Sequence, residues 1–560
     1  MRQPVMSVIF GVVLGALLGS LTACDQPYDP DRPAIDPNAP RVHITSPERG
    51  TFAGDVATLV VRGTAIDDTM VTSVTVNGVP AVVHEDGSFE ATVPVEPGTN
   101  LLHAVAKDPQ GNTGKETRAV VAGTLSPIAR KVPSGITAAL SAQTFDALGR
   151  GAAGFLAAAD LGALIAPANP VIDMGTTNGQ PDCLYGQTFV TGVDLGGAAI
   201  QLAPQAAGVD LDVTLDDVRI DAHLQWAVAC LDGSRNVTAT ASKVRIRGLL
   251  ALGIENGRFA VKLQNTQVTL TNFNVDLGGV PQTIIDLLDL DTRLGPVLAW
   301  AAEKLLVPML NNALSGLNET KSIDLLGKTI DLAVAPARIK ASVVGAVVEL
   351  DTELRAQGDG ASPGFVYVKN VVPAMDESQG FQLAVADDAA NQLLGSFWAA
   401  KGMEIALDLA NGPYGEVGRL YDRVELSAKV PPHLDANGDR LRLTIGDFLA
   451  TFRDGGAVAT QIAINAQVDL RVVHDPDGKL RLDVGAPTVY VDILDENVDG
   501  ANVLSSAQFE AISTFALARV VAFGSSAIGA VPLPSVGGVS MQNVTVLQQT
   551  GYVIVDGEIQ

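Results

Sequence analysis

A long alternation of apolar and polar residues constrains the fold of this 560-residue chain more than any other feature. Apolar residues recur at every second position from Val209 to Leu215, the phase flips at Asp216-Asp217, and the alternation resumes from Val218 to Cys230. Successive side chains of a strand point to opposite faces, so this run predicts an antiparallel strand with one buried and one solvated face. The flip predicts a bulge or bend.

Similar strand-like runs fill most of the chain after residue 125, and a few helices interrupt them. Helical spacing predicts helices at 145–156, at 390–398 with Asp387 as a possible N-cap, at 294–317, and at 507–523 with a Ser505/Gln508 capping box. The segment ITAALSAQTFDAL at 136–148 matches FQLAVADDAANQL at 381–393 in apolar pattern. We therefore expect a duplicated unit, each copy an elongated sheet wrapped around helices.

The N-terminus predicts export. One basic residue precedes an apolar run from Val5 to Ala23, and the run ends in small residues. The segment LTAC at 21–24, which ends this run, resembles the lipobox of bacterial lipoproteins. The resemblance implies cleavage before Cys24 and lipid on that cysteine, with palmitate among its acyl chains. An ordinary secretory signal ending near a cysteine is the alternative. We expect a lipid-anchored protein of the bacterial cell envelope, and the sequence leaves the inner or outer membrane open.

Composition narrows the possible partners. The formal net charge of −25 argues against nucleic acid and against docking on anionic headgroups through a basic patch. The mean hydropathy is +0.26 and 47% of the residues are hydrophobic, yet the mature chain has no second run that could span a bilayer. Such a chain buries unusually much apolar surface or keeps apolar surface for a ligand.

Residues 41–123 predict a small β-sandwich. The segment SVTV at 73–76 alternates, Asn77-Gly78 suits a type I′ turn, and more short strands follow. The phrases VTVNG and DGSFEATVPVEPGTN resemble bacterial immunoglobulin-like modules, which accompany many exported enzymes and adhesins. We assign no site to this unit.

Cys183 and Cys230 are the two cysteines that follow Cys24. Export places them in an oxidising compartment, where one disulfide is the default and two buried free thiols are the alternative.

The second copy resembles a known family. The segment GFQLAVADDAANQLLGSFWAAKGMEIAL at 380–407, with Asn391 and Gly402, is similar to the opening of the C-terminal barrel in bactericidal/permeability-increasing, lipopolysaccharide-binding and lipid-transfer proteins. Residues 430–452 resemble that family's Pro-rich hairpin entry, and residues 533–559 resemble its closing strands.

The resemblance covers roughly 125–560 and implies an α+β, β-rich boomerang of two tubular lipid-binding barrels around a central sheet. It also implies acyl chains held between helices and sheet, and a disulfide in the first barrel that Cys183 and Cys230 could supply. The acidity of this chain disfavours lipopolysaccharide binding through positive charge and favours neutral or zwitterionic lipids. The predicted segments are a signal peptide over 1–23, a lipidated Cys and Pro/Asp-rich linker over 24–40, the immunoglobulin-like sandwich over 41–123, a first barrel over 125–325, and a central sheet with a second barrel over 326–560.

Apolar helix faces supply the candidate lipid-binding residues, each of which could fill a core instead. The first pocket is predicted to include Phe145, Leu148, Phe155, Leu288, Leu298 and Leu305. The second is predicted to include Leu394, Phe397, Trp398, Met403, Phe515 and Phe523.

The sequence gives only weak signals for a metal-binding or catalytic site. Asp495, Asn497 and Asp499 begin a calcium-loop pattern, but its twelfth position is Ser506, so a plain acidic turn is favoured and we expect neither metal nor cofactor. The six histidines are scattered, no HExxH occurs, and Gly524-Ser525-Ser526 is not part of a G-x-S-x-G elbow. We therefore expect a tethered lipoprotein that binds lipid or another long apolar ligand for transfer or sensing, and no enzyme. A structural or adhesive lipoprotein is the alternative, and an exported hydrolase is a weaker one.

Overall fold

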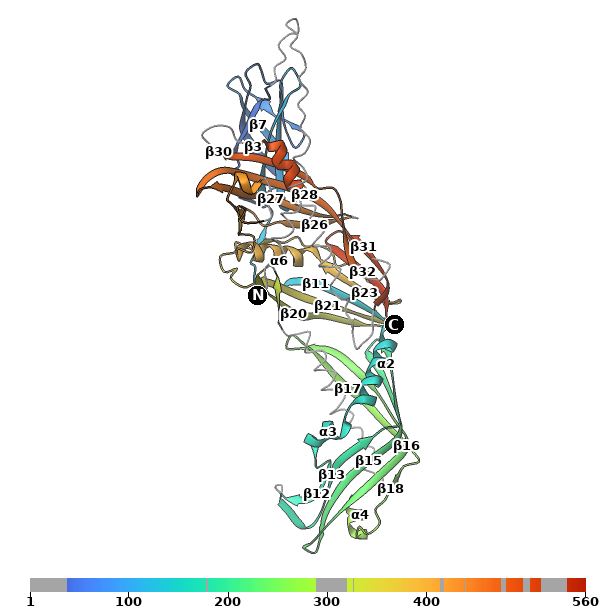
Figure 1. The fold of residues 1–560 in the computed structure, drawn as a ribbon. Coiled ribbons are helices and arrows are strands. Elements are labelled where there is room, and N and C mark those ends of the chain that lie inside the picture. The colour runs from blue at the N-terminus through green and yellow to red at the C-terminus, as the bar shows by residue number, and fades with distance from the viewer. Residues whose placement is uncertain are drawn as a thin grey trace.

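The structure is a computed structural model that describes residues 38–177, 180–288, 320–325, 327–412, 417–438, 440–474, 480–496, 504–514 and 541–559. These residues form an elongated, bent molecule (Figure 1). A β-sandwich lies at one end, a long curved sheet lies at the other, and a second curved sheet and a central sheet lie between them. The predicted fold class, an immunoglobulin-like sandwich followed by two barrel-like units of curved antiparallel sheet with helices, is confirmed.

The immunoglobulin-like unit packs two sheets face to face. One contains β1 (Arg41–Ser46), β3 (Thr58–Ile66), β7 (Ser88–Pro94) and β6 (Val82–Val83), and the other contains β2 (Thr51–Gly54), β9 (Thr113–Ala122), β8 (Gly98–Lys107), β4 (Ser73–Val76) and β5 (Val79–Pro80). Alternate residues such as Val61, Phe89 and Leu102 are buried between them. Asn77 and Gly78 both have positive φ in the β4–β5 turn, as a type I′ turn requires.

The first barrel is built on the alternating run. Its sheet contains β12 (Ile172–Thr177), β13 (Gln180–Asp194), β15 (Gly208–Val228), β16 (Leu231–Glu255) and β17 (Arg258–Thr271), with β14 (Gly197–Gln205) and β18 (Asn274–Val275) at the side. The predicted irregularity falls at Asp217, whose φ is 48°. Leu215 pairs with Val244, and Val218 pairs with Ala241. The apolar side chains of β15 and β16 therefore switch to the other face at the same level, and the pairing register of the two strands is kept.

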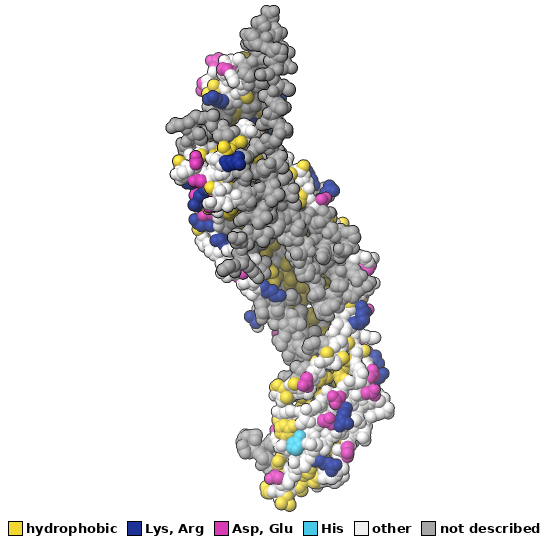
Figure 2. All heavy atoms as spheres, viewed as in Figure 1, with side chains coloured by type: hydrophobic (Ala, Val, Ile, Leu, Met, Phe, Trp, Pro, Cys, Tyr) yellow, Lys and Arg dark blue, Asp and Glu magenta, His cyan; other side chains and the backbone are white. Residues whose placement is uncertain are grey.

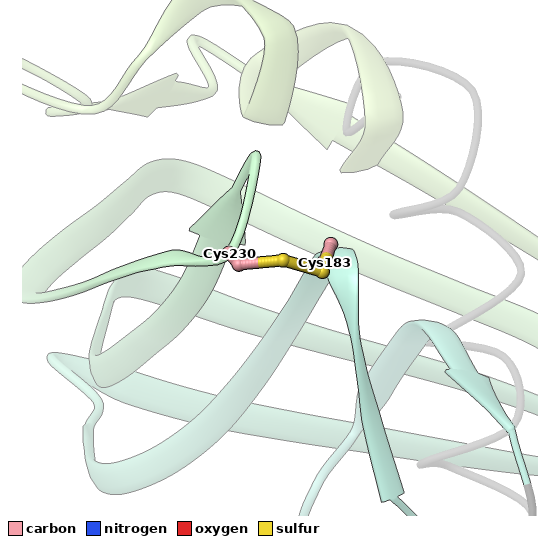
Figure 3. The surroundings of a disulfide bond; sticks show 2 residues. All are labelled: Cys183 and Cys230. Atoms are coloured by element: carbon pink, nitrogen blue, oxygen red, sulfur yellow. A yellow bond between two sulfur atoms is a disulfide. The ribbon is translucent and has the colours of Figure 1, made fainter.

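The predicted disulfide joins Cys183 to Cys230 (Figure 3). Cys183 lies in β13, and Cys230 lies in the turn between β15 and β16. The Cys230 amide also donates a hydrogen bond of 3.0 Å to the Cys183 carbonyl, so the bond ties β13 to that turn where the two already meet.

The central sheet joins the two copies. Its order is β19 (Lys321–Leu325), β20 (Lys328–Ala341), β21 (Gly345–Ala356), β11 (Val132–Ser141), β23 (Phe381–Ala386), β32 (Tyr552–Ile559) and β31 (Met541–Gln549). Strands β11 and β23 begin the matching segments 136–148 and 381–393, and they pair antiparallel with Ala138 opposite Leu383. Because these residues occupy the same position in the two segments, the pairing has the two-fold symmetry expected of a duplication.

Each of these two strands leads into a helix. Strand β11 leads into α2 (Ala142–Ala158), whose N-cap Ser141 accepts a hydrogen bond from the Thr144 amide. Strand β23 leads into α6 (Asp387–Ala399), and here one prediction was wrong: the N-cap is Ala386, and Asp387 is the first helical residue. The Asp387 carboxylate is not free to cap α6, because it accepts a hydrogen bond of 3.0 Å from the Ala436 amide.

The second barrel repeats the plan with a shorter sheet. That sheet contains β24 (Ile405–Asp408), β25 (Arg423–Ala428), β27 (Arg440–Asp454), β28 (Ala457–His474) and β29 (Leu480–Val484), with β26 (His433–Asn437) and β30 (Thr488–Glu496) paired at the side. A helix begins at residue 506, and the Gln508 amide and the Ser505 hydroxyl form the predicted capping box.

The remaining described elements are short. They are α3 (Leu161–Ile165), the 3₁₀ turn Ala166–Ala168, α4 (Gln282–Leu288), α7 (Val417–Leu420), and the two-residue strands β10 (Leu125–Ser126) and β22 (Phe365–Val366). Within the described ranges, every helix is too short or too polar to cross a membrane.

Candidate functional site

The concave face of the first barrel carries more half-exposed apolar surface than an ordinary core. Fourteen hydrophobic residues of α2, α3, the first-barrel sheet and β21 form a buried cluster, and sixteen more that pack against it are only partly buried. The immunoglobulin-like core has the opposite proportion, with twelve buried and five partly buried hydrophobics. Hydrophobic side chains are exposed on the first barrel next to the central sheet and at its far end (Figure 2). The first barrel therefore presents apolar surface that its own chain covers incompletely.

Helix α2 lies close against this face. Phe145 is buried in the shared apolar cluster, and Leu148 is half-buried at its edge. A Cβ atom on Gly149 would lie 2.5 Å from the Ile200 carbonyl oxygen in β14, so only glycine permits the helix to approach the sheet so closely. Two of the predicted first-pocket residues are thus brought together, on the helix face that meets the sheet.

A second apolar cluster lies on the sheet of the second barrel. Nine buried and nine partly buried hydrophobics form it. The Tyr421 and Phe452 rings lie 4.9 Å apart, and the Phe452 and Phe509 rings lie 5.5 Å apart, measured between ring centroids. Phe509 comes from the helix that begins at residue 506, so that helix covers part of this face.

The residues predicted for the second pocket lie elsewhere. Phe397 is buried and packs with Ala400 against Ile330 and Ala356 of the central sheet, with Met403 half-buried beside them. Helix α6 therefore places Phe397 and Met403 against the central sheet, and the structure does not bring them together with the Tyr421–Phe509 cluster.

Two more residues of that set are half-buried. The Trp398 indole donates a hydrogen bond of 2.8 Å to the Ala428 carbonyl, and its ring centroid lies 6.3 Å from that of Phe52 in the immunoglobulin-like unit. Leu394 is half-buried on the same helix.

Several predicted residues lie outside what the structure describes. Leu298, Leu305, Phe515, Phe523, Asn497, Asp499 and Cys24 fall in segments without a described backbone, and the side chains of Phe155, Leu288 and Asp495 are not described. These assignments stay predictions. Among the described residues, His, Cys, Asp and Glu form no group of three that could hold a metal ion.

A buried ionic cluster joins the immunoglobulin-like unit to the second barrel. The Arg49 guanidinium pairs with Glu116 at 2.9 Å, with Asp447 at 2.6 Å and with Asp492 at 3.0 Å. Asp447 is fully buried, and its other oxygen accepts a hydrogen bond from the Ala119 amide. Burial raises the pKa of Asp492 to about 6, although Arg49 opposes the shift. The sandwich is therefore fixed to the second barrel by desolvated charges, which the sequence did not reveal.

Two adjacent buried carboxyl groups begin α6. Burial raises the pKa of Asp387 to about 6 and that of Asp388 to about 7. The Asp388 carboxylate accepts a hydrogen bond of 3.1 Å from the Val368 amide. The sequence signal for this pair was the doublet Asp387-Asp388 directly after an apolar strand, which we interpreted as a helix start.

Three of the described histidines, His103, His223 and His433, make structural contacts. The Nδ1 atoms of His103 and His223 lie 2.8 Å from the Thr117 hydroxyl and from the Asn236 side-chain oxygen, respectively. The His433 ring packs against Gly98, and burial lowers its pKa to about 4. None of these three contacts a serine or cysteine side chain in the described hydrogen bonds.

Comparison with known proteins gives one family match and several similar structures. The family model described as Glucodextranase, domain B matches residues 40–124, which form the immunoglobulin-like sandwich. None of the curated proteins matches the chain.

Among solved structures, the chain is similar to lipopolysaccharide binding protein, with 14% identity, a TM-score of 0.36, and coverage of 77% of this chain and 99% of that chain. It is similar to P47 of Clostridium botulinum E1, with 9% identity, a TM-score of 0.22, and coverage of 77% and 100%. It is also similar to latherin, with 20% identity, a TM-score of 0.16, and coverage of 35% and 90%.

Proposed function

We propose that the chain is a membrane-tethered lipoprotein of the bacterial cell envelope that binds lipid, or another long apolar ligand, on the concave faces of its two barrels. The bound ligand would be transferred or sensed. The observation that carries the proposal is the first barrel's excess of partly buried over buried hydrophobic side chains. Surface of that kind marks a ligand or partner site in soluble proteins.

The dimensions of the first barrel suit an acyl chain. Moving a sixteen-carbon chain through water costs about 12 kcal/mol, at roughly 0.8 kcal/mol per methylene, so a carrier must offer a long apolar surface. Strand β15 has 21 residues, and at roughly 3.3 Å per residue it spans about 70 Å. That length exceeds the half-thickness of a bilayer's hydrocarbon core, about 15 Å, several times over.

Tethering is the second part of the proposal. The LTAC segment at 21–24 supports lipid attachment at Cys24, and five prolines and four aspartates in 25–40 support a stiff spacer between membrane and sandwich. A Cys24→Ser chain should lose palmitate labelling in cells. Labelling that persists in this variant would remove the anchor from the proposal.

Lipid binding is tested by organic extraction and mass spectrometry of a chain that begins at Asn38, purified without detergent. This chain lacks Cys24, so any lipid recovered is held by contacts alone. We expect co-purified lipid, or uptake of fluorescent phospholipid. A chain with neither would favour the structural or adhesive alternative.

Strand β17 offers a matched pair of variants for the same measurement. Leu270 is partly buried in the first-barrel cluster, while its neighbour Thr269 is exposed. Leu270→Asp should lower the bound lipid several-fold, because a charge on the apolar face must be desolvated beside the acyl chain. Thr269→Asp should leave the amount unchanged. Equal loss in both variants would contradict binding on the concave face.

A further inference from the structure

A polar cavity lies apart from the apolar clusters described above. Its volume is about 210 Å³, and it lies where β11, β32, the start of α6 and residues 367–372 meet. Polar side chains around it are those of Ser134, Tyr367, Lys369, Asn370, Asp388 and Tyr552. Pockets for drug-sized ligands measure about 300–1,000 Å³, so this cavity suits a smaller, headgroup-sized molecule.

One wall of the cavity is an irregularity in β11. Ser134 has φ of 49°, and the register of β11 against β21 shifts between Val132 and Ile136. The Ser134 amide donates to Asp351 at 3.0 Å, and its hydroxyl donates to Glu349 at 2.9 Å. Left-handed backbone at a non-glycine residue costs about 1–3 kcal/mol and persists where the surroundings hold it. The wall is therefore built by specific contacts.

Two largely buried side chains, those of Asp388 and Tyr552, line the cavity. Asp388 is 5% exposed, and within the described part of the chain no lysine or arginine forms an ion pair with it. Tyr552 is 3% exposed and lies in the cavity wall with Asp388. Burial raises the pKa of Asp388 to about 7 and that of Tyr552 to about 12. Both side chains line the cavity, so a cation bound there would meet a carboxylate that has no counter-ion among the described residues.

The charged residues around the cavity determine which charge a ligand can carry there. The negative charges of Asp387, Asp388 and Glu349 help to raise the pKa of Tyr552. The negative charge of Asp351 likewise helps to raise the pKa of Tyr367.

Two basic residues oppose these acids. The Arg130 guanidinium lies 5.4 Å from the Tyr367 ring centroid and covers one face of that ring. Lys369 is exposed at the cavity, so its ammonium group stays in solvent. The arrangement repels anions and favours a cation.

We propose that this cavity binds an organic ammonium group, with the Asp388 carboxylate as its counter-ion and the Tyr552 and Tyr367 side chains around it. Tyrosine rings attract ammonium cations through their faces, and the buried Asp388 carboxylate gains a counter-ion. The ammonium group could come from a phosphatidylcholine-type headgroup or from a free compound such as choline. The proposal does not rest on acyl-chain binding, because the cavity is lined by other residues.

Isothermal titration calorimetry on the full chain, in a detergent without an ammonium group, tests the proposal. Choline should bind, and 3,3-dimethylbutanol, its uncharged analogue, should not. A separate titration with short-chain phosphatidylcholine distinguishes the sources: binding of choline alone assigns a free compound, and much tighter binding of the phospholipid assigns a headgroup. Absence of binding by both would overturn the proposal.

Two variants locate the site. Asp388→Asn keeps the shape of the side chain and should weaken choline binding ten-fold or more, whereas Asp376→Asn makes the same charge change at an exposed position and should have no effect. Tyr367→Leu, as a single variant, should weaken choline binding a few-fold. Choline affinity should also rise from pH 6 to pH 8 as Asp388 ionises. Equal affinity of Asp388→Asn and the unchanged chain, with both folded by circular dichroism, would overturn the assignment.

Discussion

The two copies begin alike and then use their helices differently. Ala147 in α2 and Gln392 in α6 occupy matching positions of segments 136–148 and 381–393, and both are buried. Ala147 lies on a helix that faces the apolar sheet of the first barrel. Gln392 instead accepts a hydrogen bond from the Leu354 amide and donates to the Ile128 and Arg130 carbonyls.

Polar side chains extend this difference along α6. The Asn391 side chain exchanges two hydrogen bonds of 2.8 Å with the backbone of Leu434, and the Ser396 hydroxyl donates to Asp359 at 2.6 Å. The second copy is thus fixed to the central sheet and, through Arg49, to the immunoglobulin-like unit. The first copy keeps an apolar face with few such attachments, so we expect it to be the better ligand carrier.

The largest effect should follow loss of the ionic cluster. Arg49→Met leaves Asp447, Glu116 and Asp492 without their shared cation, and breaking a buried ion pair costs about 3–5 kcal/mol. Urea denaturation should show this loss at pH 8, and a smaller one at pH 5, where Asp492, whose pKa burial raises to about 6, can take up a proton. The exposed pair of Arg62 and Glu90 provides the control, since Arg62→Met should cost under about 1 kcal/mol. Equal losses in the two variants would mean that Arg49 does not attach the sandwich.

Removing the polar anchor of α6 should come next. Gln392→Leu removes three hydrogen bonds that a fully buried side chain makes to the backbone of Leu354, Ile128 and Arg130, which costs about 2–4 kcal/mol. Gln143 is an exposed glutamine of α2, and Gln143→Leu should change the unfolding free energy by less than about 0.5 kcal/mol. Thermal denaturation of both variants measures the difference. Similar melting temperatures would show that the two helices are held in the same way.

A smaller effect should appear in the pH dependence of stability. The pKa of Asp388 is raised to about 7 from 3.8, so folding favours its protonated form. That contribution is complete below pH 3.8 and is lost as pH rises through 7. Asp388→Asn should therefore be more stable than the unchanged chain at pH 8, by about 1–3 kcal/mol, and nearly equal at pH 4.

Urea midpoints across this range measure the effect. Asp387 keeps its own raised pKa in the variant, so some pH dependence should remain. A variant less stable than the unchanged chain at pH 8 would show that the ionised Asp388 is satisfied within the protein.

Local pattern predicted the parts of this fold that local physics controls. The alternation around Asp217, the Asn77-Gly78 turn, the capping box at Ser505 and the pairing of Cys183 with Cys230 all depend on neighbouring residues or on the compartment. The duplication was visible because both copies repeat one apolar pattern.

The buried polar groups could not be predicted in the same way. Asp388 lies at a helix start, where an acid is ordinarily solvated and favourable, and it is buried because residues 367–372 pack over it together with β11 and β32. Arg49 and Asp447 are far apart in sequence, and only the docking of two units brings them together. Tertiary contacts of this kind leave no periodic signal in the sequence.

Photo-crosslinking shows directly whether lipid binds on the concave face of the first barrel. A phospholipid with a photoactivatable group in its acyl chain is bound to the protein, irradiated, and the modified peptides are identified by mass spectrometry. We expect modification of Leu148 in α2 and of inward residues such as Val268 and Leu270 in β17, ahead of any peptide from 380–403. Modification confined to outward residues such as Thr269, or to the 380–403 peptides, would contradict the concave face of the first barrel as the lipid site.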